Sequence, residues 1–225
     1  QYNISPEKII GVKSSGVSVN KMLTQSTPLT HLKTEGACLT PNGAMFKNDN
    51  QGFLPEMMET MYNERVIYKK RMLKAKKEYE KTKDPKLVRE ISRCHNIQWA
   101  RKIALNSAYG AVGNQYFRYF DIKVAEAVTL TGQLAIQWAE RSMNNAMNKV
   151  LKTDKDYIIA IDTDSLYVNF GPMIEELKPK DPVKFLDKIC REHFEPILKK
   201  AYDDLFVKMN CHKPRMEMAR EVIAD

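Results

Sequence analysis

Apolar and charged residues alternate with a helical period across the middle of the chain. No glycine or proline occurs between Pro55 and Pro85, and methionine and tyrosine recur there at spacings of three and four residues. Such spacing places the apolar side chains on one face of a helix. The pattern predicts a helix over about residues 55–81, which would be about 40 Å long at 1.5 Å per residue.

The dipeptide Asp84-Pro85 separates this helix from another one. Proline is tolerated in the first turn of a helix but not in its interior, so a new helix is expected to start here. We predict that it runs from residue 86 to about 109 and ends near Gly110 or Gly113. Two long helices joined by so short a turn run antiparallel, which predicts a protruding helical hairpin.

The remaining pattern predicts a mixture of helices and short strands. Residues 1–54 indicate irregular structure with short strands, and Pro41-Asn42-Gly43 is a strong turn signal. Two β-prone runs, 157–161 and 166–170, flank a tight turn. Further predictions are a core helix over 121–151, a linker over 178–182, a helix over 183–208 and a short strand pair near 216–223. This order favours an α+β fold, with a small antiparallel sheet packed on helices.

Composition excludes some classes of protein. The 225 residues are 43% hydrophobic, and no uncharged apolar stretch approaches the 18 residues of a membrane span. The N-terminus does not resemble a signal peptide, and the four cysteines are scattered without a CxxC pair. A cytoplasmic location is therefore expected. Cys94-His95 and Cys211-His212 lack the spacing of zinc ligands, so no zinc site is predicted.

The positive charge is concentrated in one segment. Between Glu64 and Lys102 there are 14 lysine or arginine residues against five aspartate or glutamate residues, whereas the whole chain has a net charge of +8. The rest of the chain is therefore close to neutral. A local excess of this kind favours a polyanionic partner such as nucleic acid or nucleotide phosphates. The alternative is a solvated helix surface.

Asp162-Thr163-Asp164-Ser165 occupies the turn between the two β-prone runs. Two carboxylates at one tight turn repel each other unless a cation lies between them. Such a pair therefore points to divalent metal ions and phosphoryl chemistry. The alternative is an ordinary hairpin turn, in which aspartate is common.

A polar stripe lies near the end of the second long helix. Lys102, Asn106, Tyr109 and Gly113 recur at i, i+4, i+7 and i+11 and thus share one face. An ammonium, an amide and a phenol on one face could hold a nucleotide, and Gly110 and Gly113 would allow close approach. The alternative is a plain exposed face, with Gly110 as a C-cap.

The first long helix offers cations of its own. Arg65 and Lys69 lie one turn apart, with Lys76 two turns further on. If the two helices pair, Arg65 and Lys69 could lie beside Lys102 and form a clamp for a triphosphate. Most of the other lysines fit a charged helix surface equally well. Our hypothesis places the turn acids and this clamp on opposite sides of one nucleotide.

These motifs together resemble family B DNA polymerases. The helix pattern Lys-x3-Asn-Ser-x-Tyr-Gly, at residues 102–110, is similar to motif B of that family, and the Asp-Thr-Asp hairpin is similar to motif C. The stretches 1–6, 106–114 and 117–121 resemble the polymerases of T4-like bacteriophages most. The resemblance covers essentially the whole chain. It implies a palm over residues 1–53 and 115–225 and fingers over 54–114.

The resemblance also implies roles for individual residues. Asp164 would bridge two Mg²⁺ ions, with Asp162 as its partner near the primer end. Arg65, Lys69 and Lys102 would contact the triphosphate of a dNTP, and Asn106 would lie beside it at the new base pair. The implied contacts with the primer-template DNA and its base pairs are Tyr109, Gly110 and Glu221, the last an acid near the metal ions.

The resemblance further implies that this chain is a fragment. The family's motif A strand, with a further metal-binding aspartate, would precede Gln1, and an exonuclease domain and a thumb are also expected elsewhere. We therefore expect the isolated chain to have little activity, either as part of a longer polymerase or as one subunit of a split one. A nucleic-acid-binding module without catalysis is the alternative. A reverse transcriptase or nucleotidyl cyclase usually lacks the Lys-x3-Asn-Ser-x-Tyr-Gly helix.

Overall fold

The computed structural model describes residues 1–13 and 16–224 and divides into two compact units. Unit 1 comprises residues 1–3, 9–50 and 127–225, and unit 2 comprises residues 4–8 and 51–126. The fold is α+β, as predicted. None of the helices in the described ranges is both long and apolar enough to span a membrane.

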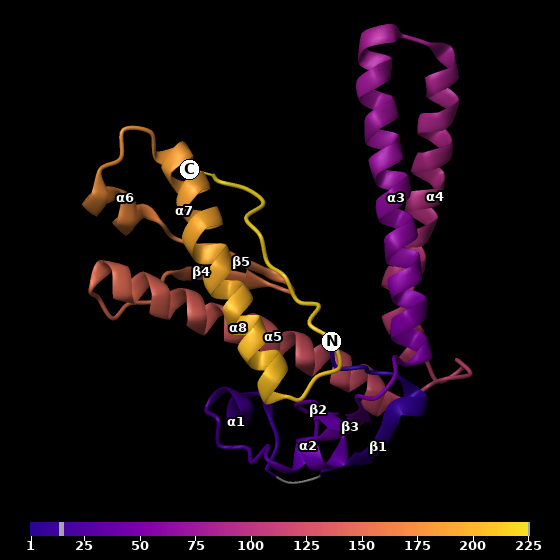
Figure 1. Ribbon diagram of the computed structural model, residues 1–225, viewed down its shortest axis with the longest axis vertical. Coiled ribbons are helices and arrows are strands. Elements are labelled where there is room, and N and C mark those ends of the chain that lie inside the picture. The colour runs from indigo at the N-terminus through magenta and orange to yellow at the C-terminus, as the bar shows by residue number, and fades with distance from the viewer. Residues whose placement is uncertain (14–15, 225) are drawn as a thin grey trace. The chain divides into compact units, whose positions relative to one another are not determined.

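Unit 2 is built on an antiparallel pair of long helices (Figure 1). Helix α3 (Phe53–Thr82) ends where Lys83 adopts a left-handed conformation, and α4 (Pro85–Val112) follows directly. The Asp84 carboxylate caps α4 by accepting a hydrogen bond from the Lys86 amide at 2.9 Å, with Pro85 in the first turn. The predicted break and hairpin are therefore confirmed. The short 3₁₀ turn η1 (Pro6–Lys8) also belongs to this unit.

The N-terminal part of unit 1 forms a small antiparallel sheet in the order β1-β3-β2. Its strands are β1 (Ile9–Val12), β2 (Ala37–Leu39) and β3 (Ala44–Lys47), and two short helices, α1 (Val19–Leu23) and α2 (His31–Glu35), lie between β1 and β2. The predicted turn at Pro41-Asn42-Gly43 joins β2 to β3, with Gly43 at a φ of +86°. Cys38, Leu39 and Phe46 are fully buried in this sheet.

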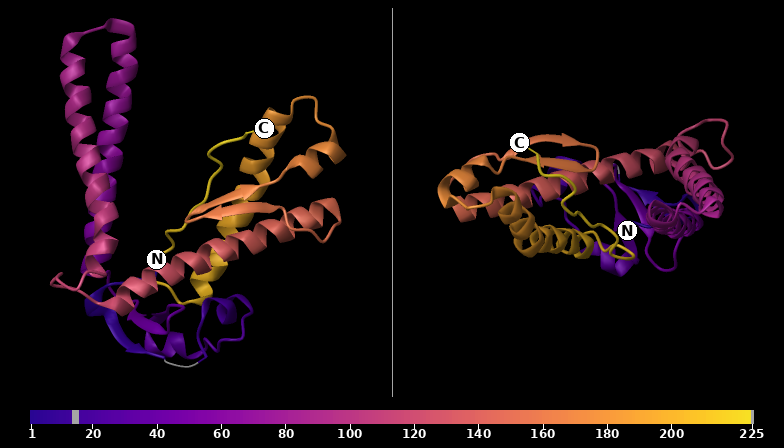
Figure 2. Two further views of the ribbon diagram at one scale, coloured as in Figure 1. Left: turned by 180° about the vertical axis from the view of Figure 1, so that it is seen from behind. Right: turned by 90° about the horizontal axis from the view of Figure 1, so that it is seen from above.

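The second part of unit 1 contains several helices and a two-stranded hairpin. Helix α5 (Ile122–Leu151) starts in unit 2, and its buried residues in unit 1 include Leu134, Met143 and Met147. Strands β4 (Ile158–Asp162) and β5 (Ser165–Val168) form the hairpin, followed by α6 (Gly171–Leu177). Helix α8 (Glu195–Lys208) crosses one face of the hairpin (Figures 1 and 2).

Three details differ from the sequence prediction. Helix α6 was not predicted. The predicted helix over 183–208 consists of α7 (Pro182–Ile189), a π-helical turn η2 (Cys190–Phe194) and α8. The predicted strand pair near 216–223 is wrong, because these described residues form no ladder. The alternating burial of residues 216–220 instead reflects an extended segment with one side against the protein.

Candidate active site

The turn between β4 and β5 holds both acids of the predicted pair. Asp162 pairs with Ser165 at the end of the ladder, so Thr163 and Asp164 form the turn itself. Thr163 has a φ of +50°, an uncommon conformation for a β-branched residue and one associated with functional sites. Its hydroxyl donates a hydrogen bond to Asp162 Oδ1 at 3.1 Å. Both aspartates are exposed, so their carboxylates are accessible to a ligand.

No cation of the described chain neutralises these two carboxylates. Neither Asp162 nor Asp164 forms an ion pair within residues 1–13 and 16–224. The Asp164 carboxylate instead acts on Tyr202 of α8. Burial raises the pKa of the Tyr202 phenol to about 12, and the negative charge of Asp164 adds to this shift. The turn is therefore a concentrated negative charge, which attracts cations.

The two carboxylates of this turn are suitable ligands for a divalent metal ion, but they form only part of a ligand set. Carboxylate oxygens are hard ligands of the kind that Mg²⁺ prefers. Among the described residues, however, no group of three or more histidine, cysteine, aspartate or glutamate residues could hold a metal ion. The cysteines of the Cys-His pairs are buried free thiols. The turn thus supplies two carboxylates, and further ligands would have to come from elsewhere.

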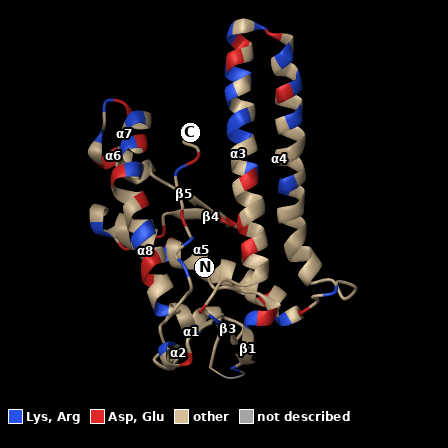
Figure 3. Cartoon of the chain, turned by 45° about the vertical axis from the view of Figure 1, so that its right-hand side comes forward, with Lys and Arg blue, Asp and Glu red and all other residues tan. Residues whose placement is uncertain are grey.

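The predicted cations lie on the two helices of unit 2. An ion pair between Arg101 Nε and Glu64 Oε2, at 2.6 Å, shows which residues of α3 and α4 lie opposite each other. Arg65 and Lys102 each follow one member of this pair, so they lie at the same level of the hairpin. Lysine and arginine residues recur along both helices (Figure 3). The sequence thus predicted correctly that these cations lie on paired antiparallel helices.

Lys102 does not pair with a carboxylate among the described residues. Its Nζ lies 4.9 Å from the centroid of the Trp99 ring, in a cation–π contact one turn earlier on α4. The Trp99 ring in turn stacks on His95. Cation–π contacts at exposed sites are weak, about 0.5–1 kcal/mol, so the ammonium can leave the ring for an anion.

The polar stripe of α4 continues from Lys102 toward the end of the helix. Asn106 and Tyr109 are exposed, and an added Cβ at Gly110 would meet no atom within 4 Å. A Cβ at Gly113 would make only an ordinary contact with Ala125, at 3.7 Å. Packing within the chain therefore does not require either glycine. The open space beside Gly110 is compatible with the close approach of a ligand.

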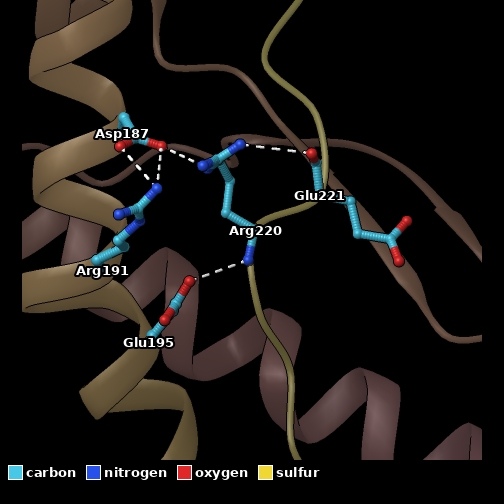
Figure 4. A network of polar contacts seen from close by, with 5 residues as sticks. All are labelled: Asp187, Arg191, Glu195, Arg220 and Glu221. Carbon is cyan, nitrogen blue, oxygen red and sulfur yellow. Dashed lines mark hydrogen bonds and ion pairs between the residues drawn. The ribbon is translucent and has the colours of Figure 1, made fainter. Parts of the chain in front are cut away.

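Glu221 lies in unit 1, in the extended segment that follows α8. Its side chain points away from the guanidinium group of Arg220 (Figure 4) and is exposed. The three acids predicted for the site, Asp162, Asp164 and Glu221, thus belong to unit 1. The five predicted side chains on the helices, and Gly110, belong to unit 2.

The sequence prediction missed an aromatic cluster in unit 2. Phe53 and Tyr119 have ring centroids 5.0 Å apart, Phe117 lies edge-on to Tyr119, and Arg118 contacts the Tyr119 ring. Tyr116 beside them is 88% exposed. Aromatic rings next to cations are typical of surfaces that bind single-stranded nucleic acid. The run Tyr116-Phe-Arg-Tyr-Phe120 carries this signal in the sequence.

Comparison with known proteins identifies relatives of the chain. Residues 1–209 match the sequence profile of DNA polymerase family B. The chain is 30% identical over 272 residues to the DNA-directed DNA polymerases of Escherichia phage RB69 and Enterobacteria phage T4, in alignments that cover 100% of this chain. It is also 34% identical to DNA polymerase 1 of Pyrococcus abyssi, over 65% of this chain and 17% of that protein. The chain spans about 30% of the length of the two phage polymerases.

Proposed function

The chain belongs to DNA polymerase family B, and we propose that it forms the palm and fingers of a DNA-directed DNA polymerase. Residues 1–53 and 115–225 would form the palm and residues 54–114 the fingers. The observation that carries this proposal is the turn between β4 and β5, which presents two exposed carboxylates without a cationic partner in the described chain. The substrates would be primer-template DNA and a dNTP, and the site of action the cytoplasm of a host cell.

Asp164 and Asp162 would hold the metal ions of this polymerase. Family B DNA polymerases generally use divalent metal ions, and we propose two Mg²⁺ ions here, with Asp164 shared between them. When bound, such ions lower the pKa of the primer 3′-hydroxyl and stabilise the departing pyrophosphate. The Asp162 carboxylate, oriented by the Thr163 hydroxyl, would lie on the side of the primer end.

The helical hairpin would bind the triphosphate of the incoming nucleotide. Arg65, Lys69 and Lys102 would offset its negative charge, which also grows on the leaving pyrophosphate during the reaction. Lys102 would exchange its contact with Trp99 for the stronger contact with phosphate oxygens. Closure of the hairpin would exclude water from the nucleotide.

The exposed end of α4 would face the new base pair. The amide of Asn106 and the ring of Tyr109 would pack beside the base and sugar, and the open space at Gly110 would admit the base pair itself. These groups test the shape of the pair, whereas base pairing with the template selects the nucleotide. The aromatic cluster around Tyr119 offers ring faces on which unpaired bases could stack.

The palm would be completed by segments outside this chain. The β4–β5 hairpin has only two strands and exposes apolar side chains, with Ile159 72% and Tyr167 54% exposed. Two-stranded hairpins are marginally stable alone, so a further strand that covers these residues would stabilise the sheet. We propose that this strand carries another metal-binding aspartate. It would belong, with an exonuclease and a thumb, to the same polypeptide or to a partner subunit.

Primer extension tests the proposed activity. The chain is assayed alone and within the complete polymerase, with a labelled primer on a template of defined sequence and with Mg²⁺ or EDTA. We expect template-directed, Mg²⁺-dependent extension by the complete polymerase and little or none by the chain alone. A complete polymerase that binds primer-template but adds no nucleotide would contradict the proposal.

A second candidate function is nucleic-acid binding without catalysis. The basic surface of α3 and α4 favours it, because lysine and arginine residues follow both helices (Figure 3). Titration of the isolated chain with duplex and single-stranded DNA at increasing salt measures how many phosphates it contacts. Strong binding together with a complete polymerase that is inactive would favour this function over polymerisation.

A further inference from the structure

Residues 212–224 form an extended segment after α8 that is attached to unit 1 at two places, its beginning and Arg220. At the first place, the His212 amide donates a hydrogen bond to the Gln1 carbonyl at 3.0 Å, the His212 ring lies 2.8 Å from the Asn48 carbonyl, and the amides of Arg215 and Met216 donate to Gln1 Oε1, at 3.2 and 3.3 Å. At the second place, every hydrogen bond and ion pair found for the described residues 217–224 involves Arg220. Beyond Met216, Arg220 is therefore the residue through which the described segment makes its polar contacts with the helices.

Arg220 is held by two acids from the helices beneath it (Figure 4). Its guanidinium group contacts the Asp187 carboxylate, and its backbone amide donates to Glu195 Oε1 at 3.1 Å. Arg191 Nη2 also contacts Asp187 Oδ2, at 3.0 Å. The side chains of Arg220 and Asp187 are only 25% and 33% exposed. Salt therefore screens this ion pair less than an ion pair at the open surface.

The π-helical turn η2 brings the two acids to the same side. Asp187 precedes it and Glu195 follows it, so eight residues separate them in the sequence. In a regular α-helix of 3.6 residues per turn, that separation would rotate them about 80° apart. The wider π turn reduces this rotation, and both acids reach Arg220. Such turns are frequently found at functional sites.

The direction in which the Arg220 side chain points determines the direction in which the Glu221 side chain points. Successive side chains of an extended segment point to opposite sides. Arg220 points to the helices, and Glu221 points away from them (Figure 4). The segment passes alongside the β4–β5 hairpin in each view of Figures 1 and 2. Fixing Arg220 therefore fixes the side on which the carboxylate of Glu221 is presented.

We propose that Arg220 is a positioning residue, whose ion pair with Asp187 holds the segment 216–224 so that Glu221 is presented beside the turn acids. The inference rests on the proposed polymerase function and on the resemblance to family B DNA polymerases, which implies that Glu221 is an acid near the metal ions. Arg220 itself touches no reacting atom. Its contribution is to keep the Glu221 carboxylate in place, because small displacements of such groups slow a reaction strongly.

The test compares variants in the complete polymerase by single-turnover primer extension at several Mg²⁺ concentrations. Arg220→Gln should lower the maximal rate on the order of tenfold and raise the Mg²⁺ requirement, as Glu221→Gln should. The double variant should be no slower than either single one, because both remove the same effect. Arg220→Lys, which retains the charge, should recover part of the rate. Primer-template affinity should stay within about twofold in the two Arg220 variants, because Arg220 is not assigned to that binding.

Arg191→Gln is the matched control, because Arg191 contacts Asp187 but not the extended segment. It should leave the rate unchanged. Hydrogen exchange of residues 216–224 should be faster in Arg220→Gln and normal in Arg191→Gln. If Arg220→Gln folds poorly, Arg220→Lys is compared with Arg191→Gln instead, with a smaller loss of rate expected because the charge is retained.

Three results would overturn the inference. The first is an unchanged rate in Arg220→Gln while Glu221→Gln is slow, which would leave the proposed function intact. The second is an additive loss in the double variant. The third is an unchanged rate in Glu221→Gln, which would remove the premise, whereas synthesis by the wild type would still support the polymerase. A failure of the proposed function itself would appear differently, as a wild-type complete polymerase without synthesis.

Discussion

Unit 1 contains two acidic sites that differ in how their charge is satisfied. Asp187 is partly buried and contacts two guanidinium groups, those of Arg191 and Arg220. Asp162 and Asp164 are exposed and form no ion pair within the described residues. Paired charges maintain a structure, whereas a pair of like charges without partners is costly unless a ligand binds there. This difference distinguishes Asp187, which stabilises the structure, from Asp162 and Asp164, which are candidates for function.

Unit 2 shows the same difference between two neighbouring cations. Arg101 forms an ion pair with Glu64 across the helical hairpin, at 2.6 Å. Among the residues that the structure describes, Lys102 has only the weak contact with the Trp99 ring, which leaves its ammonium available to an anion. The sequence places both cations in one dipeptide. Only their partners in the structure show which of them is free to bind a phosphate.

The largest expected effect belongs to the unpaired acids. Asp164→Asn in the complete polymerase should reduce the rate of nucleotide addition at least about a thousandfold, or about 4 kcal/mol, because it removes a metal-binding charge. Affinity for primer-template should be retained. Single-turnover primer extension measures the rate, and filter binding measures the affinity. A loss of less than tenfold would assign Asp164 to an ordinary turn.

The next effect concerns the unpaired cation. Lys102→Ala should raise the KM for the dNTP about 10- to 100-fold, equivalent to about 1.4–2.8 kcal/mol, because the triphosphate loses a charge-assisted contact. Arg101→Gln is the matched control, since it removes the neighbouring charge but not the proposed contact. Steady-state kinetics with varied dNTP distinguishes the two. Equal KM values in both variants would refute the distinction between these cations.

The paired acid should affect stability instead. Asp187→Asn leaves the partly buried guanidinium group of Arg220, and the exposed one of Arg191, without their anion, which should lower the free energy of unfolding by about 1–3 kcal/mol. Asp164→Asn should leave it unchanged or slightly higher, because repulsion with Asp162 is relieved. Urea denaturation of the isolated chain measures both. If Asp164→Asn were the more destabilising of the two, the assignment of structural and functional acids would be reversed.

The smallest expected effect concerns the titration of the Tyr202 phenol at high pH. Burial, with the Asp164 charge, raises the pKa of Tyr202 to about 12, from an ordinary value of about 10. The neutral phenol is thus favoured in the folded state. Its contribution to stability is fully present below pH 10 and is lost as the pH rises through 12. The difference in tyrosinate absorbance between wild type and Tyr202→Phe measures this pKa.

Asp164→Asn should lower the pKa of Tyr202, because it removes a negative charge near the phenol. Asp181→Asn is a suitable control, since Asp181 is not among the groups that shift this pKa. An unchanged pKa in Asp164→Asn would show that the turn acid does not act on α8.

The long helices were predictable because their signals are local. The predicted helix at 55–81 is α3 (Phe53–Thr82), and the break at Asp84-Pro85 was predictable from the properties of proline and of a capping aspartate. Helix α6 escaped prediction because it begins with Gly171-Pro172, which also fits a loop. The prediction of a strand pair near 216–223 was wrong, because an alternating sequence pattern indicates an extended segment but does not show whether that segment pairs with another strand.

The candidate site was predictable only where its residues are close in the sequence. Asp162 and Asp164 lie on one turn, so their proximity follows from the hairpin pattern alone. The ion pair between Asp187 and Arg220 joins residues 33 positions apart, and nothing in the local pattern indicates it. The cation–π contact of Lys102 required only a helical spacing of three, but its presence depends on side-chain conformation.

The most direct test of the central claim uses Mn²⁺ as a substitute for Mg²⁺. Crystals of the complete polymerase with primer-template DNA and a dNTP are soaked in Mn²⁺, and anomalous scattering locates the ions. We expect anomalous density at the carboxylate of Asp164 and none at Asp187. Density at Asp187, or none at the β4–β5 turn, would contradict the central claim.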